Sequence, residues 1–97
     1  MWTVLEATEV RKELRRCPQR IREKYEQWKN IVRTGGPGCL LSLPGLHDEP
    51  LAGRWRGFRS SRLTLQWRVI YLVQAESVAV AVVRISGELP EREQSRV

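Results

Sequence analysis

One short stretch of the chain gathers side chains that could act on a phosphate. Between Gly53 and Tyr71 there is no Asp or Glu, and the only histidine, His47, stands just before this interval. The basic residues in the interval are Arg54, Arg56, Arg59, Arg62 and Arg68. A guanidinium group can hold a phosphate through two parallel hydrogen bonds. Histidine is the side chain whose ordinary pKa suits proton transfer near neutral pH. The pattern therefore predicts a phosphate-binding surface with a group that could move a proton.

Aromatic residues are interleaved with these arginines at Trp55, Phe58, Trp67 and Tyr71. Alternating cations and rings suit single-stranded nucleic acid, because guanidinium groups take phosphates while rings stack on bases. The competing interpretation is a sheet whose aromatics are simply core. For the rings alone we favour packing, and for Tyr71 in particular. For the arginines beside a histidine we favour a functional role.

Composition narrows the class of protein. The chain has 97 residues and a net charge of +6, so we expect a single domain spanning residues 1–97 and a polyanionic partner. No apolar run reaches the length of a membrane span, about 18 residues or more, and no apolar signal core follows Met1. These features predict a soluble cytoplasmic protein without a membrane partner. Cys17 and Cys39 lack CxxC spacing, and the chain has no second histidine, so we predict free thiols and no metal site. We also expect no cofactor.

The hydrophobic pattern predicts helices first and strands later. Residues 2–5 are expected to form an opening strand, followed by a short helix that starts near an N-cap at Thr8. A second helix should run from Pro18 to the glycines at 35 and 36, because apolar residues recur there at spacings of four, three and four. Residues 35–50 are expected to be a loop. Strands are then expected at about 54–63, about 67–73 and 77–85, with short turns that require antiparallel pairing.

This β-α-α-β-β-β order, with arginines on the sheet, resembles the RelE/HigB branch of the RelE/ParE toxin superfamily. The resemblance is carried by the runs PGLHDEPL (44–51), GFRSSRL (57–63) and WRVIY (67–71), together with Gly53. It extends over most of the chain, up to about Ile85. It implies an α+β fold in which a small twisted antiparallel sheet packs against two N-terminal helices.

The resemblance also implies a function and a site. Members of the family are toxins of type II toxin-antitoxin systems, cleave mRNA on the ribosome and are held inactive by a cognate antitoxin. The implied reaction is metal-independent attack of a ribose 2′-OH on the adjacent phosphodiester. By this resemblance His47 and Arg68 are the expected catalytic residues. Arg59 and Arg62 would hold phosphates, and Arg54 and Arg56 lie where the family is often basic. Arg59 and Arg62 stand three positions apart, so a regular strand should point them to opposite faces.

The chain departs from the family pattern at its C-terminal end. Relatives usually carry a histidine and a tyrosine after the last strand, whereas this chain reads ISGELP at residues 85–90. Glu88 is the candidate that could take a catalytic role there, and we expect the tail at about 87–97 to be frayed. Two alternatives to the endoribonuclease follow. One is a non-catalytic module that binds RNA, the ribosome or an antitoxin, and the other is a ParE-like gyrase inhibitor.

Overall fold

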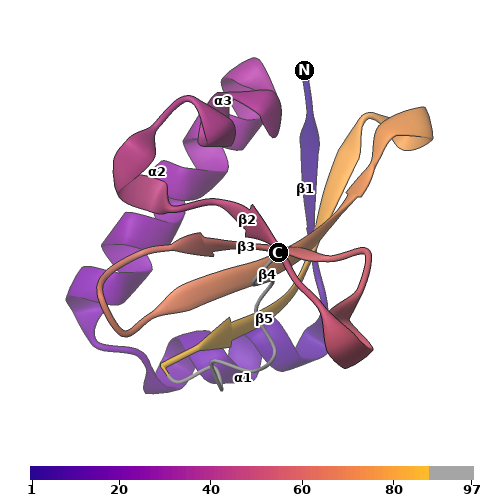
Figure 1. The fold of residues 1–97 in the computed structure, drawn as a ribbon. Helices are drawn as coiled ribbons and strands as arrows, with labels where there is room; N and C mark the ends of the chain where they lie inside the picture. Colours follow the sequence, from indigo (N-terminus) through magenta and orange to yellow (C-terminus); the bar gives the residue numbers. More distant parts are fainter. Residues whose placement is uncertain (88–97) are drawn as a thin grey trace.

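The computed structural model describes residues 1–87, and Figure 1 traces their course. Single 3₁₀ turns occur at Pro44–Leu46, Gly53–Trp55 and Ala75–Ser77. The helices and strands in chain order are β1 (Thr3–Glu6), α1 (Thr8–Arg16), α2 (Gln19–Gly35), α3 (Gly38–Leu41), β2 (Glu49–Pro50), β3 (Arg59–Arg62), β4 (Arg68–Gln74) and β5 (Ala79–Ser86). The predicted α+β order is confirmed, with α3 and β2 added inside the segment that was expected to be a loop.

Helix α2 forms because its apolar residues fall on one face. Ile21, Tyr25, Trp28 and Val32 are each at most 1% exposed, as their helical spacing predicts. The helix ends where Gly36 adopts a φ of 83° and its N–H bonds to the carbonyl of Val32. Helix α1 differs from the prediction by one residue, because Ala7 is the N-cap and Thr8 is already helical.

Within residues 1–87 the five strands form one sheet in the order β1-β5-β4-β3-β2. The pairs β2–β3, β3–β4 and β4–β5 are antiparallel, as short connections require. The pair β1–β5 is parallel, so the prediction of a purely antiparallel sheet was wrong at this edge. No tight turn joins these two strands, because all the other helices and strands lie between them in the sequence. The chain returns through these elements, so that β5 runs alongside β1 (Figure 1).

Two strands begin later in the sequence than predicted. The strand expected from about residue 54 begins at Arg59, because Gly53–Trp55 forms a 3₁₀ turn and Gly57 adopts a φ of 94°. The strand expected from residue 77 begins at Ala79, because Val78 has a left-handed φ of 50°. The arginines at 54 and 56 therefore lie on a loop rather than on the sheet.

The helices cover one face of the sheet and seal the core. Val69 and Tyr71 of β4 and Val80 and Val82 of β5 join the buried cluster with α1 and α2. Side chains alternate along a strand, so Arg68 and its cross-strand partner Arg62 point to the other face. Within residues 1–87 no helix is long and apolar enough to cross a membrane.

Candidate phosphate-binding site

Arg68 is the centre of the site. Its side chain is only 8% exposed. Its Nε and Nη2 donate to the Oγ of Ser60 at 3.0 and 2.7 Å, and Nη2 also donates to the main-chain carbonyl of His47 at 3.1 Å. Burial lowers the pKa of Arg68, and the carboxylate of Glu49, 4.0 Å from Nη2, opposes this effect. The structure thus joins Arg68 to the main chain of His47, two of the three predicted catalytic residues, and holds the charge of Arg68 in a poorly solvated position.

His47 itself is exposed and has an unusual backbone. Its φ is 43° and its ψ is 48°, the left-handed conformation, at the end of the 3₁₀ turn Pro44–Leu46. This conformation is uncommon for residues with a side chain, although histidine is among those that adopt it most readily. It closes the turn, because the His47 N–H bonds to the carbonyl of Pro44 at 3.1 Å. The imidazole is left accessible while the carbonyl is bound by Arg68.

The carboxylate of Asp48 holds the same turn in place. Its carboxylate is 0% exposed. It accepts hydrogen bonds from the Nε of Arg59 at 2.7 Å, the Oγ of Ser61 at 2.5 Å and the hydroxyl of Tyr71 at 2.5 Å. Three donors compensate for burying the charge. Asp48 therefore fixes the segment that carries His47, and this role was missed by sequence analysis.

Arg59 and Arg62 point to opposite faces of the sheet, as their spacing predicts. Arg59 pairs across the strands with Tyr71, which packs edge-to-face on Trp28 of α2. Burial acts against the charge of Arg59, but the hydrogen bond and charge of Asp48 outweigh it, so the pKa of Arg59 is raised. One nitrogen of Arg59 is therefore committed to Asp48.

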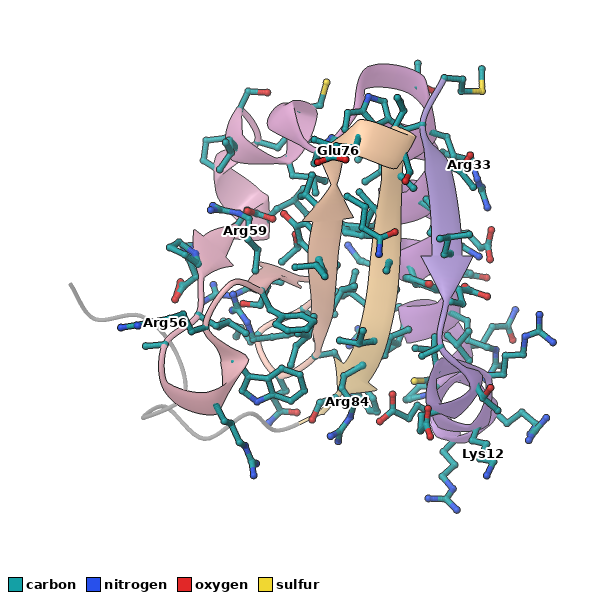
Figure 2. The ribbon with its side chains drawn as sticks, turned by 90° about the vertical axis from the view of Figure 1, so that its right-hand side faces the viewer. Lys12, Arg33, Arg56, Arg59, Glu76 and Arg84 are labelled. Carbon is teal, nitrogen blue, oxygen red and sulfur yellow. The ribbon has the colours of Figure 1, made fainter. Side chains whose placement is uncertain are left out.

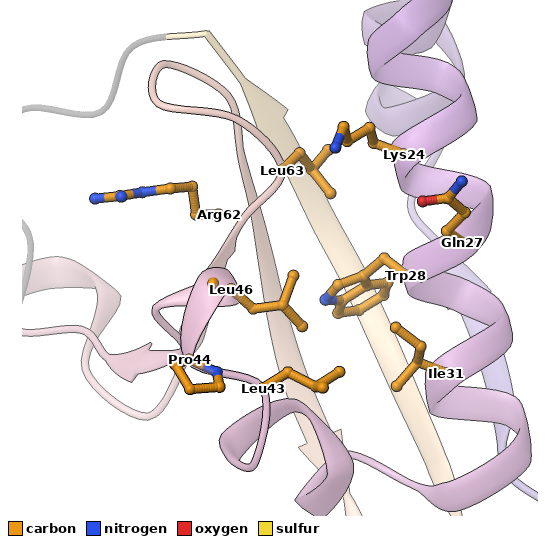
Figure 3. A pocket seen from close by; sticks show the side chains of 10 residues that line it. Lys24, Gln27, Trp28, Ile31, Leu43, Pro44, Leu46, Arg62 and Leu63 are labelled. Atoms are coloured by element: carbon orange, nitrogen blue, oxygen red, sulfur yellow. The ribbon is translucent and has the colours of Figure 1, made fainter.

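Arg62 lies on the same face as Arg68. Its Nε is buried and has no hydrogen-bond partner among residues 1–87. Figure 3 shows its side chain extending away from α2. An arginine with a buried, unpaired N–H beside a second arginine is suited to an anionic ligand, because a phosphate oxygen would satisfy the donor.

The two remaining arginines lie outside this pair. Arg54 and Arg56 are both exposed, and Figure 2 shows Arg56 projecting away from the body of the protein. Trp55 and Phe58 pack edge-to-face with ring centres 5.5 Å apart. Tyr71 is fully buried, so its predicted packing role is confirmed.

Some predicted features cannot be placed. Glu88 and the tail beyond residue 87 lie outside the described residues. Among residues 1–87 there is no cluster of three or more potential metal ligands. Ser60, which receives two hydrogen bonds from Arg68, was missed because a serine in a strand carries no signal in the sequence. Asp48 gave one weak signal, an acid placed directly after the only histidine.

The fold is that of RelE-type toxins. It combines a mixed sheet, two N-terminal helices on one face of that sheet, and the turn Pro44–Leu46 before the edge strand β2. YafQ from E. coli strain BL21(DE3) matches with a TM-score of 0.71 and 17% identity over 89% of this chain and 92% of that one. The archaeal RelE–RelB complex from Pyrococcus horikoshii OT3 matches with a TM-score of 0.69 and 17% identity over 99% of this chain and 98% of that one. The YoeB/ParE toxin from Agrobacterium tumefaciens matches with a TM-score of 0.65 and 19% identity over 87% and 95%. No protein-family model and no curated protein sequence matches the chain. The predicted resemblance is thereby confirmed at the level of the fold.

Proposed function

We propose that this protein is the toxin of a type II toxin-antitoxin system and cleaves mRNA on the ribosome. The observation that supports the proposal is the hydrogen bond from the buried guanidinium of Arg68 to the main-chain carbonyl of His47, because it ties the turn that bears the accessible imidazole to a positive charge. The fold is that of YafQ and of RelE in its complex with RelB. A cognate antitoxin is accordingly the proposed protein partner.

In the proposed reaction the 2′-OH attacks the adjacent phosphorus to form a 2′,3′-cyclic phosphate, and the bond to the 5′-oxygen breaks as that oxygen takes a proton from solvent. The imidazole of His47 accepts the hydroxyl proton. Arg68 stabilises the charge that develops on the non-bridging oxygens, and its burial strengthens this effect because the local dielectric is low. Arg62 binds a neighbouring phosphate. Glu88 remains a predicted catalytic residue, as a stand-in proton acceptor.

The test is primer extension on cellular mRNA after a brief pulse of expression. The best variant is His47→Asn, because asparagine tolerates the left-handed backbone and the imidazole is exposed, so the fold should be retained. Loss of one acid–base group should reduce cleavage about 10²- to 10⁴-fold. Lys12→Gln, on the exposed face of α1, is the control and should cleave as the wild type does. Unchanged cleavage by His47→Asn would refute the assignment.

One observation favours a second candidate, a module that binds RNA without cutting it. Arg68 already donates Nε and Nη2 to Ser60 and His47, as a purely structural arginine would. This hypothesis predicts salt-sensitive binding to RNA that stays intact. Removing one arginine that binds a phosphate should then reduce the slope of log K against log salt by about 0.7, so Arg56→Gln should flatten it by that amount. A DNA-damage response without mRNA cuts would instead indicate the ParE-like alternative.

A further inference from the structure

We propose that Glu13 of α1 is a positioning residue of the phosphate-binding site, because it holds the end of β5 beside Arg68. Its carboxylate contacts β5 twice. Oε1 accepts a hydrogen bond from the main-chain N–H of Ile85 at 2.8 Å, and Oε2 accepts one from the Nε of Arg84 at 2.7 Å. Figure 2 shows Arg84 at the end of β5, where this strand packs against α1. The inference rests on the proposed function, since it assigns a further residue to the same site.

The last residues of β5 have a strand on one side only. β1 pairs with β5 from Ala79 to Val82, and α1 begins two residues after β1 ends. From Val83 onward, β4 is the only strand among residues 1–87 that pairs with β5. A main-chain N–H on the open edge of a strand needs another acceptor when it is buried, and Ile85 is only 1% exposed. The carboxylate of Glu13 supplies that acceptor.

A bulge interrupts the ladder just before this stretch. Ile70 of β4 pairs with Arg84, whereas the next residue, Tyr71, pairs with Val82, so Val83 is an extra residue in β5. A bulge disrupts the ladder locally and increases the twist of the strand. The short stretch of ladder beyond it therefore depends more on contacts from outside the sheet.

Arg68 belongs to the last pair of this ladder. It lies opposite Ser86, one residue after the N–H that Glu13 holds. Loss of that hydrogen bond should let the end of β5 fray and leave the main chain of Arg68 with less support. The guanidinium would then lose its fixed place against Ser60 and the carbonyl of His47. A misplacement of about 1 Å in a catalytic group can cost about 100-fold in rate.

The hydrogen bond to the main chain, rather than the ion pair, should produce this effect. The side chain of Arg84 is 45% exposed, and exposed ion pairs contribute little. Glu13→Ala removes both contacts and keeps a strong helix former in α1. In Glu13→Gln the amide oxygen can still accept from Ile85. Arg84→Gln removes the ion pair and leaves the hydrogen bond to the main chain.

The experiment is single-turnover cleavage of mRNA on purified ribosomes with saturating protein, at a temperature where circular dichroism shows every variant folded. Glu13→Ala should cleave about 10- to 100-fold more slowly. Glu13→Gln and Arg84→Gln should stay within about threefold of the wild type. The matched control is Glu9→Ala, exposed on the same helix, which should cleave as the wild type does. A role in stability alone would leave the rate of folded, saturating protein unchanged.

The Nε–H signal of Arg68 in ¹⁵N NMR spectra of the full chain tests the inference without cleavage. It should shift in Glu13→Ala and stay in place in Glu13→Gln and Glu9→Ala. An unmoved signal or an unchanged rate in Glu13→Ala overturns the inference, and so does an equal loss of rate in Arg84→Gln. A wild-type protein that cleaves no mRNA refutes the proposed function instead, and the Arg68 signal then decides the inference by itself.

Discussion

Asp48 is the residue whose replacement tests the site's architecture most directly. Its carboxylate is fully buried and holds Arg59, Ser61 and Tyr71. In Asp48→Asn the amide cannot serve all three partners as the carboxylate does. If its oxygen faces the two hydroxyls, its NH₂ group opposes the guanidinium of Arg59. If it is flipped, the two hydroxyls must rotate to accept.

The expected cost follows from these contacts. Breaking a buried ion pair costs about 3–5 kcal/mol, but Arg59 is 28% exposed and regains hydration, so we expect a loss of about 2–4 kcal/mol in the free energy of unfolding. Urea unfolding followed by tryptophan fluorescence measures it by linear extrapolation. A double-mutant cycle with Tyr71→Phe should give a coupling energy of about 0.5–3 kcal/mol, because the two residues share a hydrogen bond.

The matched control is the neighbouring acid. Glu49 is 34% exposed and its carboxylate lies 4.0 Å from Arg68, so Glu49→Gln should cost less than about 1 kcal/mol. If Asp48→Asn is no more destabilising than Glu49→Gln, Asp48 does not anchor the His47 turn and the reasoning fails.

Two further predictions concern stability away from the site. Gly36→Ala should destabilise by about 1–3 kcal/mol, because φ is +83° and a Cβ would lie 2.6 Å from an indole nitrogen, whereas Gly45→Ala meets nothing within 4 Å and should be nearly neutral in thermal unfolding. Burial raises the pKa of Glu6, but the hydrogen bond from Tyr25 and the charge of Lys29 outweigh it, so the net shift is downward from 4.5. Its stabilisation is complete above that ordinary value and is lost as pH falls through the folded-state pKa. The difference in unfolding free energy between the wild type and Glu6→Gln should therefore shrink from about pH 7 to about pH 3, and a constant difference would contradict the assignment.

Local patterns were sufficient to predict the helices and most of the strands. The apolar spacing of α2 fixed its buried face, and the short connections fixed the antiparallel order of β3, β4 and β5. The parallel pairing of β1 with β5 was missed because the two strands are far apart in the sequence and become neighbours only in the folded sheet. Strand β2 was missed because it has only two residues, one of them a proline.

The charge of the site was less predictable than its position. The interval from Gly53 to Tyr71 contains no Asp or Glu, so the sequence alone offers its arginines no acidic partner within the interval. Glu49 on β2 pairs with Ser60 on β3, and this pairing brings two acids next to arginines of the interval. Asp48 forms an ion pair with Arg59, and Glu49 lies 4.0 Å from Arg68. A count of charges within one interval cannot detect pairing with a strand that lies outside that interval.

The same short ladder therefore serves both halves of the proposed site. The ladder places Glu49 opposite Ser60. Asp48 then accepts hydrogen bonds from Arg59 and Ser61 of β3, and the carbonyl of His47 accepts one from Arg68. Asp48 neutralises Arg59 and also holds the His47 turn. Arg59 therefore has less charge to offer a phosphate, while the turn that carries the imidazole is fixed more firmly. This division is consistent with a site in which the exposed loop arginines supply affinity for polyanions, while the two residues joined by the Arg68 hydrogen bond supply geometry.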